Sequence, residues 1–130
     1  MGATATIAVI EDDFAVRNAL MFSLQADGLS VRGYESAEDA LRDTLLSEID
    51  CFVIDHRLPR MNGLDLLATL RARGIDVPVV LIAGAAGPVL RASAAAASAM
   101  VIEKPLIGDE LFEFIHASLV GGPGATMNRT

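Results

Sequence analysis

Three short motifs contain the residues whose types and spacing could carry out chemistry. They are the acidic run Glu11, Asp12 and Asp13, the single Asp55, and Lys104, and each lies at the end of an apolar run. Carboxylates held close together repel one another, and a hard divalent cation with oxygen ligands relieves that repulsion. A lysine adds a positive charge suited to a phosphate oxygen. A carboxylate nucleophile, a metal ion and a lysine would together make a phosphoryl-acceptor site, because the two cations neutralise charge on the transferring group.

The motifs meet only if the apolar runs before them are neighbouring strands of one sheet. Runs of this kind predict five strands, at residues 7–10, 31–34, 51–54, 79–82 and 100–102. The runs at 51–54 and 79–82 are apolar throughout, which is typical of strands covered on both faces in a parallel sheet.

Segments with a helical period separate the predicted strands. The first is predicted as a helix over residues 14–27 that Gly28 ends. Ser36 begins the second, because Asp39 three residues later resembles a capping box. The side chains expected to face inward are Val16, Leu20 and Leu24 from the first helix and Ala37, Ala40, Leu41 and Leu45 from the second.

Three further helical segments complete a regular alternation. One ends near Gly74, one is the alanine-rich segment 89–97, and the last is marked by Leu111, Phe112, Ile115 and Leu119. A strand followed by a helix, five times over, predicts an α/β fold: a flavodoxin-like, doubly wound sheet of five parallel strands in the order 2-1-3-4-5, with five helices. Ligands bind such sheets beyond the carboxyl ends of the strands, where the three motifs lie.

The bulk composition restricts the class of protein. A chain of 130 residues, 52% of them hydrophobic, has room for one domain with a sizeable core, which we expect over residues 6–120 with a flexible tail over 121–130. The net charge of −7 argues against direct binding to nucleic acid, and no apolar run is long enough to span a membrane. A lone Cys51 and a start without a secretory signal predict a cytoplasmic location.

Taken together, the motifs resemble the receiver domain of bacterial two-component response regulators, the CheY-like superfamily. The pieces that carry the resemblance are Val9-Ile10-Glu11-Asp12, then Val53-Ile54-Asp55 with Pro59 and Gly63 four and eight residues later, then Ile102-Glu103-Lys104-Pro105. Each piece alone is a weak signal, but the three together at these spacings are specific.

The resemblance implies a role for each residue of the motifs. Asp55 would be the phosphoacceptor and Lys104 would contact the phosphoryl group. Mg²⁺, with Mn²⁺ as a substitute, would be held by Glu11, Asp12, Asp55 and the backbone carbonyl of Arg57. The Lys104–Pro105 peptide bond is expected to be cis, as is common in the family.

One alternative stays open within the acidic run. Glu11–Asp12 and Asp12–Asp13 could each supply the acidic pair, and Asp12 belongs to both. Alignment on Val16-Arg17 and on the separation from Asp55 favours Glu11–Asp12.

The function implied by the resemblance is that of a phosphoacceptor signalling module in a two-component phosphorelay. A histidine kinase or a histidine phosphotransfer protein would donate the phosphoryl group, and a downstream protein partner or output domain would read it. The domain would not be an enzyme beyond catalysing its own phosphoryl transfer and aspartyl-phosphate hydrolysis. Phe22, which a helical wheel points at solvent, is a candidate for phosphodonor docking, and Phe114, Val89 and Leu90 are candidates for a homodimer or output surface.

The chain departs from the family pattern at two positions. Receivers usually carry Thr or Ser at the end of the fourth strand and Tyr or Phe in the fifth, whereas this chain has Ala83 and Val101. Losing one hydrogen bond to a charged group removes about 1.5–3 kcal/mol, and a complete two-state switch needs about 5.5 kcal/mol. We therefore expect that Asp55 is still phosphorylated, and that the signal uses another route or the active-like state is already populated.

Three other functions fit parts of the sequence. A phosphorylation-independent, receiver-like protein-binding module is favoured by Ala83 and Val101 and disfavoured by the intact acidic, acceptor and lysine set. A phosphatase of the haloacid dehalogenase type would place a second acid two residues after its nucleophile, where this chain has Arg57. A flavodoxin would need phosphate-binding donors in the first loop, which is acidic here.

Overall fold

The computed structural model describes residues 4–106 and 108–120, and its centre is one sheet of five parallel strands. The strands are β1 (Thr6–Ile10), β2 (Ser30–Tyr34), β3 (Cys51–Asp55), β4 (Val79–Ala83) and β5 (Ala99–Glu103). Their order is β2-β1-β3-β4-β5, so β1 and β3 are hydrogen-bonded neighbours. The predicted order and direction of the strands are confirmed.

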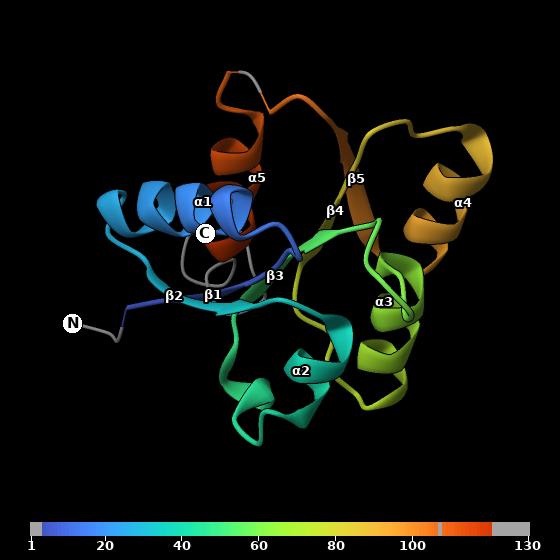
Figure 1. Cartoon of the computed structure of the whole chain (residues 1–130), viewed down its shortest axis with the longest axis horizontal. Coiled ribbons are helices and arrows are strands. Elements are labelled where there is room, and N and C mark those ends of the chain that lie inside the picture. The colour runs from blue at the N-terminus through green and yellow to red at the C-terminus, as the bar shows by residue number, and fades with distance from the viewer. Residues whose placement is uncertain (1–3, 107, 121–130) are drawn as a thin grey trace.

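Helices cover both faces of the sheet (Figure 1). They are α1 (Phe14–Ala26), α2 (Ala37–Arg42), α3 (Gly63–Ala72), α4 (Pro88–Ala96) and α5 (Glu110–Val120), with a short 3₁₀ turn, η1 (Leu46–Glu48), before β3. α1 and α5 pack on one face, and α2, α3 and α4 pack on the other. This is the doubly wound, flavodoxin-like arrangement that the alternation of strands and helices predicts.

Alternate residues of β3 enter two separate cores. Phe52 and Ile54 pack with the residues buried by α2, α3 and α4, whereas Cys51 and Val53 pack with those buried by α1 and α5. All four side chains are at most 1% exposed. Burial on both faces is the reason that this strand is apolar until its last residue, Asp55, which lies at the carboxyl end of the sheet.

The second helix is shorter than predicted. α2 ends at Arg42, and Leu45, which we expected to face inward, is 48% exposed. Asp43 follows the helix, and its carboxylate accepts hydrogen bonds from the backbone N–H of Leu45 at 2.8 Å and from the hydroxyl of Tyr34 at 2.5 Å. Leu46, in η1, is buried instead. The prediction for Leu45 is wrong because these contacts turn the chain out of the helix three residues earlier.

Two details of the helix starts also differ from expectation. The Ser36 side chain accepts a hydrogen bond from the backbone N–H of Asp39 at 3.0 Å, but the Asp39 carboxylate pairs with Arg42 instead of completing a capping box. Val16 is 40% exposed, so the apolar stripe of α1 is fully buried only at Leu24.

Three other expectations concern the end of α1, membrane-spanning helices and the tail of the chain. Gly28 ends α1 with a φ of 89°, as its position predicted. No helix in the described ranges, 4–106 and 108–120, is long and apolar enough to cross a lipid bilayer. The predicted tail at 121–130 lies outside the described residues.

Candidate functional site

The acidic run of the first motif and Asp55 of the second meet because β1 and β3 are paired in register. Ile10 lies beside Ile54, so the next residues, Glu11 and Asp55, leave the sheet side by side. One carboxylate oxygen from each of Glu11, Asp12 and Asp55 lies within 4.8 Å of the other two. Glu11 and Asp55 are 4% and 5% exposed, while Asp12 is open to solvent. Three hard oxygen donors therefore converge at the carboxyl end of the sheet.

Lys104 reaches the same cluster from the end of β5. Its Nζ lies 3.4 Å from each carboxylate oxygen of Asp55. Its backbone N–H donates to the carbonyl of Ala83 at 2.7 Å, which fixes the start of the loop to the end of β4. The Lys104–Pro105 bond is cis, as expected.

Asp55 is also held by its own loop. The backbone N–H of Arg57 donates to Asp55 Oδ1 at 3.2 Å. Together with Lys104, this contact fixes the orientation of the carboxylate. The surrounding cavity measures about 490 Å³ and is lined by Glu11, Asp12, Asp13, Val16, Asp55, Arg57, Leu58, Pro59 and Lys104.

The three acids of the first motif have different positions. Asp13 caps α1, because its side chain accepts from the backbone N–H of Val16 at 3.0 Å. The backbone N–H of Asp13 donates to Glu11 Oε2 at 3.1 Å, and Arg17 Nη1 donates to the backbone carbonyl of Glu11 at 2.7 Å. Glu11 and Asp12 are thus the two acids of the run that lie with Asp55, which is the arrangement that the alignment favoured.

Burial makes the acidic cluster electrostatically costly in the absence of a cation. Desolvation raises the pKa of Glu11 to about 7, and Asp55 adds to the rise through a hydrogen bond and its negative charge. The backbone N–H of Asp13 and the charge of Lys104 act in the opposite direction. A divalent cation with oxygen ligands would offset this cost, so the residues present fit Mg²⁺.

Comparison with known proteins shows the family. A family model described as the response regulator receiver domain matches residues 7–116. The chain is a response regulator receiver domain. Among curated relatives, the response regulator protein TodT of Pseudomonas putida is 33% identical over 125 residues, covering 95% of this chain and 55% of that protein. The transcriptional regulatory protein FixJ of Azorhizobium caulinodans is 36% identical over 112 residues, and the match covers 85% of this chain and 53% of FixJ.

Solved structures agree with this membership. FixJ-N is 29% identical with a TM-score of 0.78, covering 90% of this chain and 94% of that one. The Vibrio cholerae chemotaxis protein CheY4 has a TM-score of 0.82 and covers 89% of this chain and 99% of its own chain. Because its sequence is only 19% identical, this match supports the fold alone. The receiver spans about half the length of the curated relatives it matches.

The two positions at which the sequence departs from the expected pattern, Ala83 and Val101, lie in β4 and β5. Ala83 is the last residue of β4 and is 3% exposed, and Val101 in β5 lies opposite Leu81 and is 8% exposed. Both belong to the core beneath α2, α3 and α4. The end of β4 therefore carries a methyl group and no hydroxyl.

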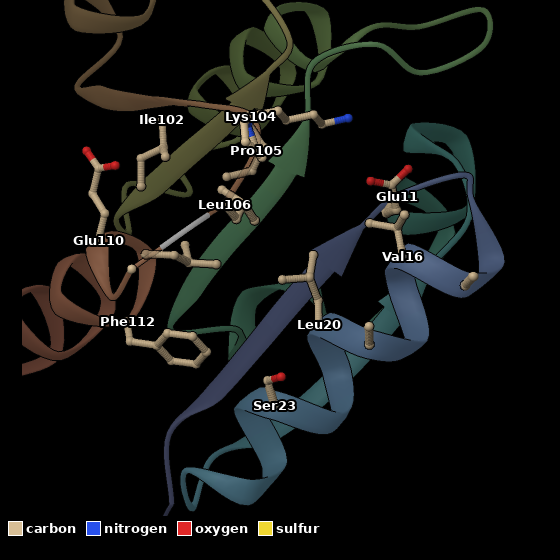
Figure 2. A pocket seen from close by; sticks show the side chains of 15 residues that line it. Glu11, Val16, Leu20, Ser23, Ile102, Lys104, Pro105, Leu106, Glu110 and Phe112 are labelled. Carbon is tan, nitrogen blue, oxygen red and sulfur yellow. The ribbon is translucent and has the colours of Figure 1, made fainter.

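A groove between α1 and α5 continues from the site (Figure 2). Its volume is about 790 Å³, and Glu11 and Lys104 lie at the end nearest Asp55. Small residues at a spacing of four on α1 leave this space open: Ala15, Ala19 and Ser23. These three residues were not predicted from the sequence, although their spacing beside the predicted inward stripe was a visible signal. Phe22 is 72% exposed as expected but does not line the groove.

Proposed function

We propose that this receiver domain accepts a phosphoryl group on Asp55 in a Mg²⁺-dependent reaction, as a signalling module of a two-component phosphorelay. The observation that carries the proposal is the convergence, at the carboxyl end of the sheet, of three carboxylates within 4.8 Å and of Lys104 at 3.4 Å from Asp55. A nucleophile, a cation site and a fixed positive charge are the components that phosphoryl transfer requires.

Each residue has a distinct part in this proposal. Glu11, Asp12, Asp55 and the backbone carbonyl of Arg57 would hold Mg²⁺ or Mn²⁺, which when bound neutralises charge on the transferring group. An oxygen of Asp55 attacks the phosphorus of the donor, and the donor keeps the electron pair of the broken bond. The backbone N–H of Arg57 orients Asp55, and Lys104 neutralises a phosphoryl oxygen. The domain catalyses this transfer and the later hydrolysis of its own aspartyl phosphate, and it is otherwise no enzyme.

The groove between α1 and α5 supports the choice of phosphodonor. It is predominantly apolar in its lining, adjoins the acidic cluster and is long enough to contact residues from Ala15 to Ser23 along α1. A histidine kinase or histidine phosphotransfer protein that lays a helix there would bring its phosphohistidine to Asp55.

The other partners follow from exposed surfaces and from charge. Val89 is 78% exposed at the start of α4, so a downstream partner, an output domain or a second copy could pack there. The net charge of −7 opposes direct contact with nucleic acid. We place this module in the cytoplasm, without a membrane contact.

Labelling by acetyl phosphate separates this function from its main alternative, a receiver-like module that binds proteins without phosphorylation. With Mg²⁺ present, the wild-type domain should shift on a phosphate-affinity gel, and chelation of the metal should abolish the shift. A chain that shows no shift with acetyl phosphate or with any cognate phosphodonor would be a binding module, as Ala83 and Val101 would then suggest.

A further inference from the structure

The loop between β3 and α3 is tightly held at both of its ends. At its start, the backbone N–H of His56 donates to the carbonyl of Ile82 at 2.9 Å. At its end, the backbone N–H of Gly63 donates to the carbonyl of His56 at 2.9 Å, and Asn62 caps α3 in a complete capping box with Asp65. These contacts fix the ends of the loop but not its middle, residues 59–61.

The middle of the loop, where Met61 also packs against the core, is contacted by an acidic side chain from another helix. Glu38 of α2 accepts a hydrogen bond from the backbone N–H of Met61 through Oε2 at 3.3 Å. Its other oxygen, Oε1, lies 3.5 Å from Nη2 of Arg60. Oε1 is buried and has no hydrogen-bond partner among the described residues, so the charge of Arg60 is its compensation. One carboxylate thus contacts two consecutive residues of the loop.

The backbone at this point needs such support. Arg60 has a φ of 62°, in the left-handed region that side chains other than glycine disfavour. A residue keeps such a conformation only where its surroundings hold it there. Pro59, whose ring fixes its own φ, joins Arg60 to the buried Leu58 and to Arg57. A change of backbone conformation at Arg60 therefore passes along a stiff segment toward Asp55.

We infer that Glu38 is a positioning residue for the metal site: through Met61 and Arg60 it holds the loop in the conformation that keeps the backbone of Arg57 at Asp55. The inference rests on the proposed function, since it takes the Arg57 carbonyl as a metal ligand. α2 contains none of the residues of the site, and Glu38 gives this helix a hydrogen bond and an ion pair to the loop that follows Asp55.

The test compares two variants that each remove one carboxylate from α2. Glu38→Ala removes both contacts to the loop, whereas Asp39→Ala removes an acid that pairs with Arg42 on the helix itself. Mn²⁺ affinity is measured by calorimetry on the whole chain. In Glu38→Ala we expect only a fraction of the molecules to hold the loop in the conformation that binds the metal. The apparent Kd for Mn²⁺ then rises by the inverse of that fraction, by about three- to tenfold. The charge-matched Asp39→Ala should change it by less than about twofold, because that acid is solvent-screened.

A second readout reports the loop without any metal. Amide exchange at Met61, measured by NMR on the metal-free domain, should accelerate in Glu38→Ala and remain unchanged in Asp39→Ala. Glu38→Gln, which keeps an acceptor for the Met61 N–H but loses the charge facing Arg60, should give intermediate values of both exchange and Kd.

The outcomes are distinct. If wild type binds Mn²⁺ and the Glu38→Ala and Asp39→Ala variants bind it with equal affinity, the positioning role is overturned and the proposed function stays intact. Wild type that binds no Mn²⁺ would overturn the proposed metal site, and the positioning role with it. Should Glu38→Ala fail to fold, Glu38→Gln decides: an affinity equal to wild type contradicts the inference.

Discussion

Asp55 derives its chemistry from its immediate surroundings. The residue is 5% exposed, and its carboxylate is contacted by Lys104 on both oxygens and accepts from the backbone N–H of Arg57. The acids beside it are not interchangeable, because Asp13 caps α1 while Glu11 and Asp12 approach Asp55. The residue types were readable from the sequence and alignment favoured Glu11–Asp12, but the capping role of Asp13 depends on a hydrogen bond that only the folded loop makes.

Replacing Ala83 should strengthen the coupling between the site and α4. Ala83→Thr restores a hydroxyl at the end of β4, and a hydrogen bond to a charged oxygen contributes about 1.5–3 kcal/mol to the state that makes it. With Mg²⁺ and beryllofluoride as the phosphoryl mimic, amide exchange over residues 84–96 should change more in Ala83→Thr than in wild type. Ala83→Val, which has the same shape without the hydroxyl, is the control; equal responses of all three chains would refute this account of the switch.

Cys51 should be chemically inert in the native protein. Its side chain is fully buried, and burial raises the pKa of the thiol to about 12. Near pH 8 only about one thiol in ten thousand would then be ionised, and the thiolate is the reactive form. Ellman's reagent should leave the native domain unlabelled and label it fully in guanidinium chloride. Rapid labelling under native conditions would mean that β3 opens far more readily than its burial indicates.

Among the elements, the strands follow from the sequence and the second helix does not. The three central strands, β1, β3 and β4, are short apolar runs, and covering both faces of a parallel sheet demands that pattern. The end of α2 instead depends on Asp43 bonding to Tyr34 of β2, a contact between elements that no local pattern encodes. The same holds for Glu38, whose sequence neighbours give no sign that it contacts the loop after Asp55.

The start of α3 approaches the end of β3 so closely that only glycine fits. A Cβ at Gly63 would lie 2.7 Å from Cα of His56 and 3.1 Å from the backbone oxygen of Asp55. Gly63→Ala should therefore cost about 1–3 kcal/mol of unfolding free energy, as overpacking typically does, and it should weaken Mn²⁺ binding by displacing the loop. Gly84→Ala, where a Cβ would meet nothing within 4 Å, is the matched control. Equal urea midpoints for the two variants would contradict the close approach.

For the whole molecule, two cores on either side of one sheet create a rigid platform with its acids at one edge. The alternation of strands and helices was enough to predict that platform and the edge where the motifs meet. The groove between α1 and α5 was not predictable in the same way, because it depends on how the two helices pack against β1, β3 and β5.

Global stability should report the occupation of the proposed metal site. Mg²⁺ at a hundred times its Kd adds about 2.7 kcal/mol to the unfolding free energy of a protein that binds it only when folded. Asp12→Asn removes one of three carboxylates that lie within 4.8 Å of one another, so the metal-free variant should be at least as stable as wild type. Its response to Mg²⁺ should be largely lost. Denaturant titrations of both chains, with Mg²⁺ or with a chelator, measure the two effects, and a full Mg²⁺ response in Asp12→Asn would exclude Asp12 as a ligand.

The most direct test of the account is the intact mass of the domain after treatment with acetyl phosphate and Mg²⁺. Wild type and Asp76→Asn, which alters an exposed acid away from the site, should each gain one phosphoryl group, about 80 Da. Asp55→Asn should gain nothing, because its amide cannot act as the nucleophile. A gain of the same mass in Asp55→Asn would contradict the assignment of Asp55 as the phosphoacceptor.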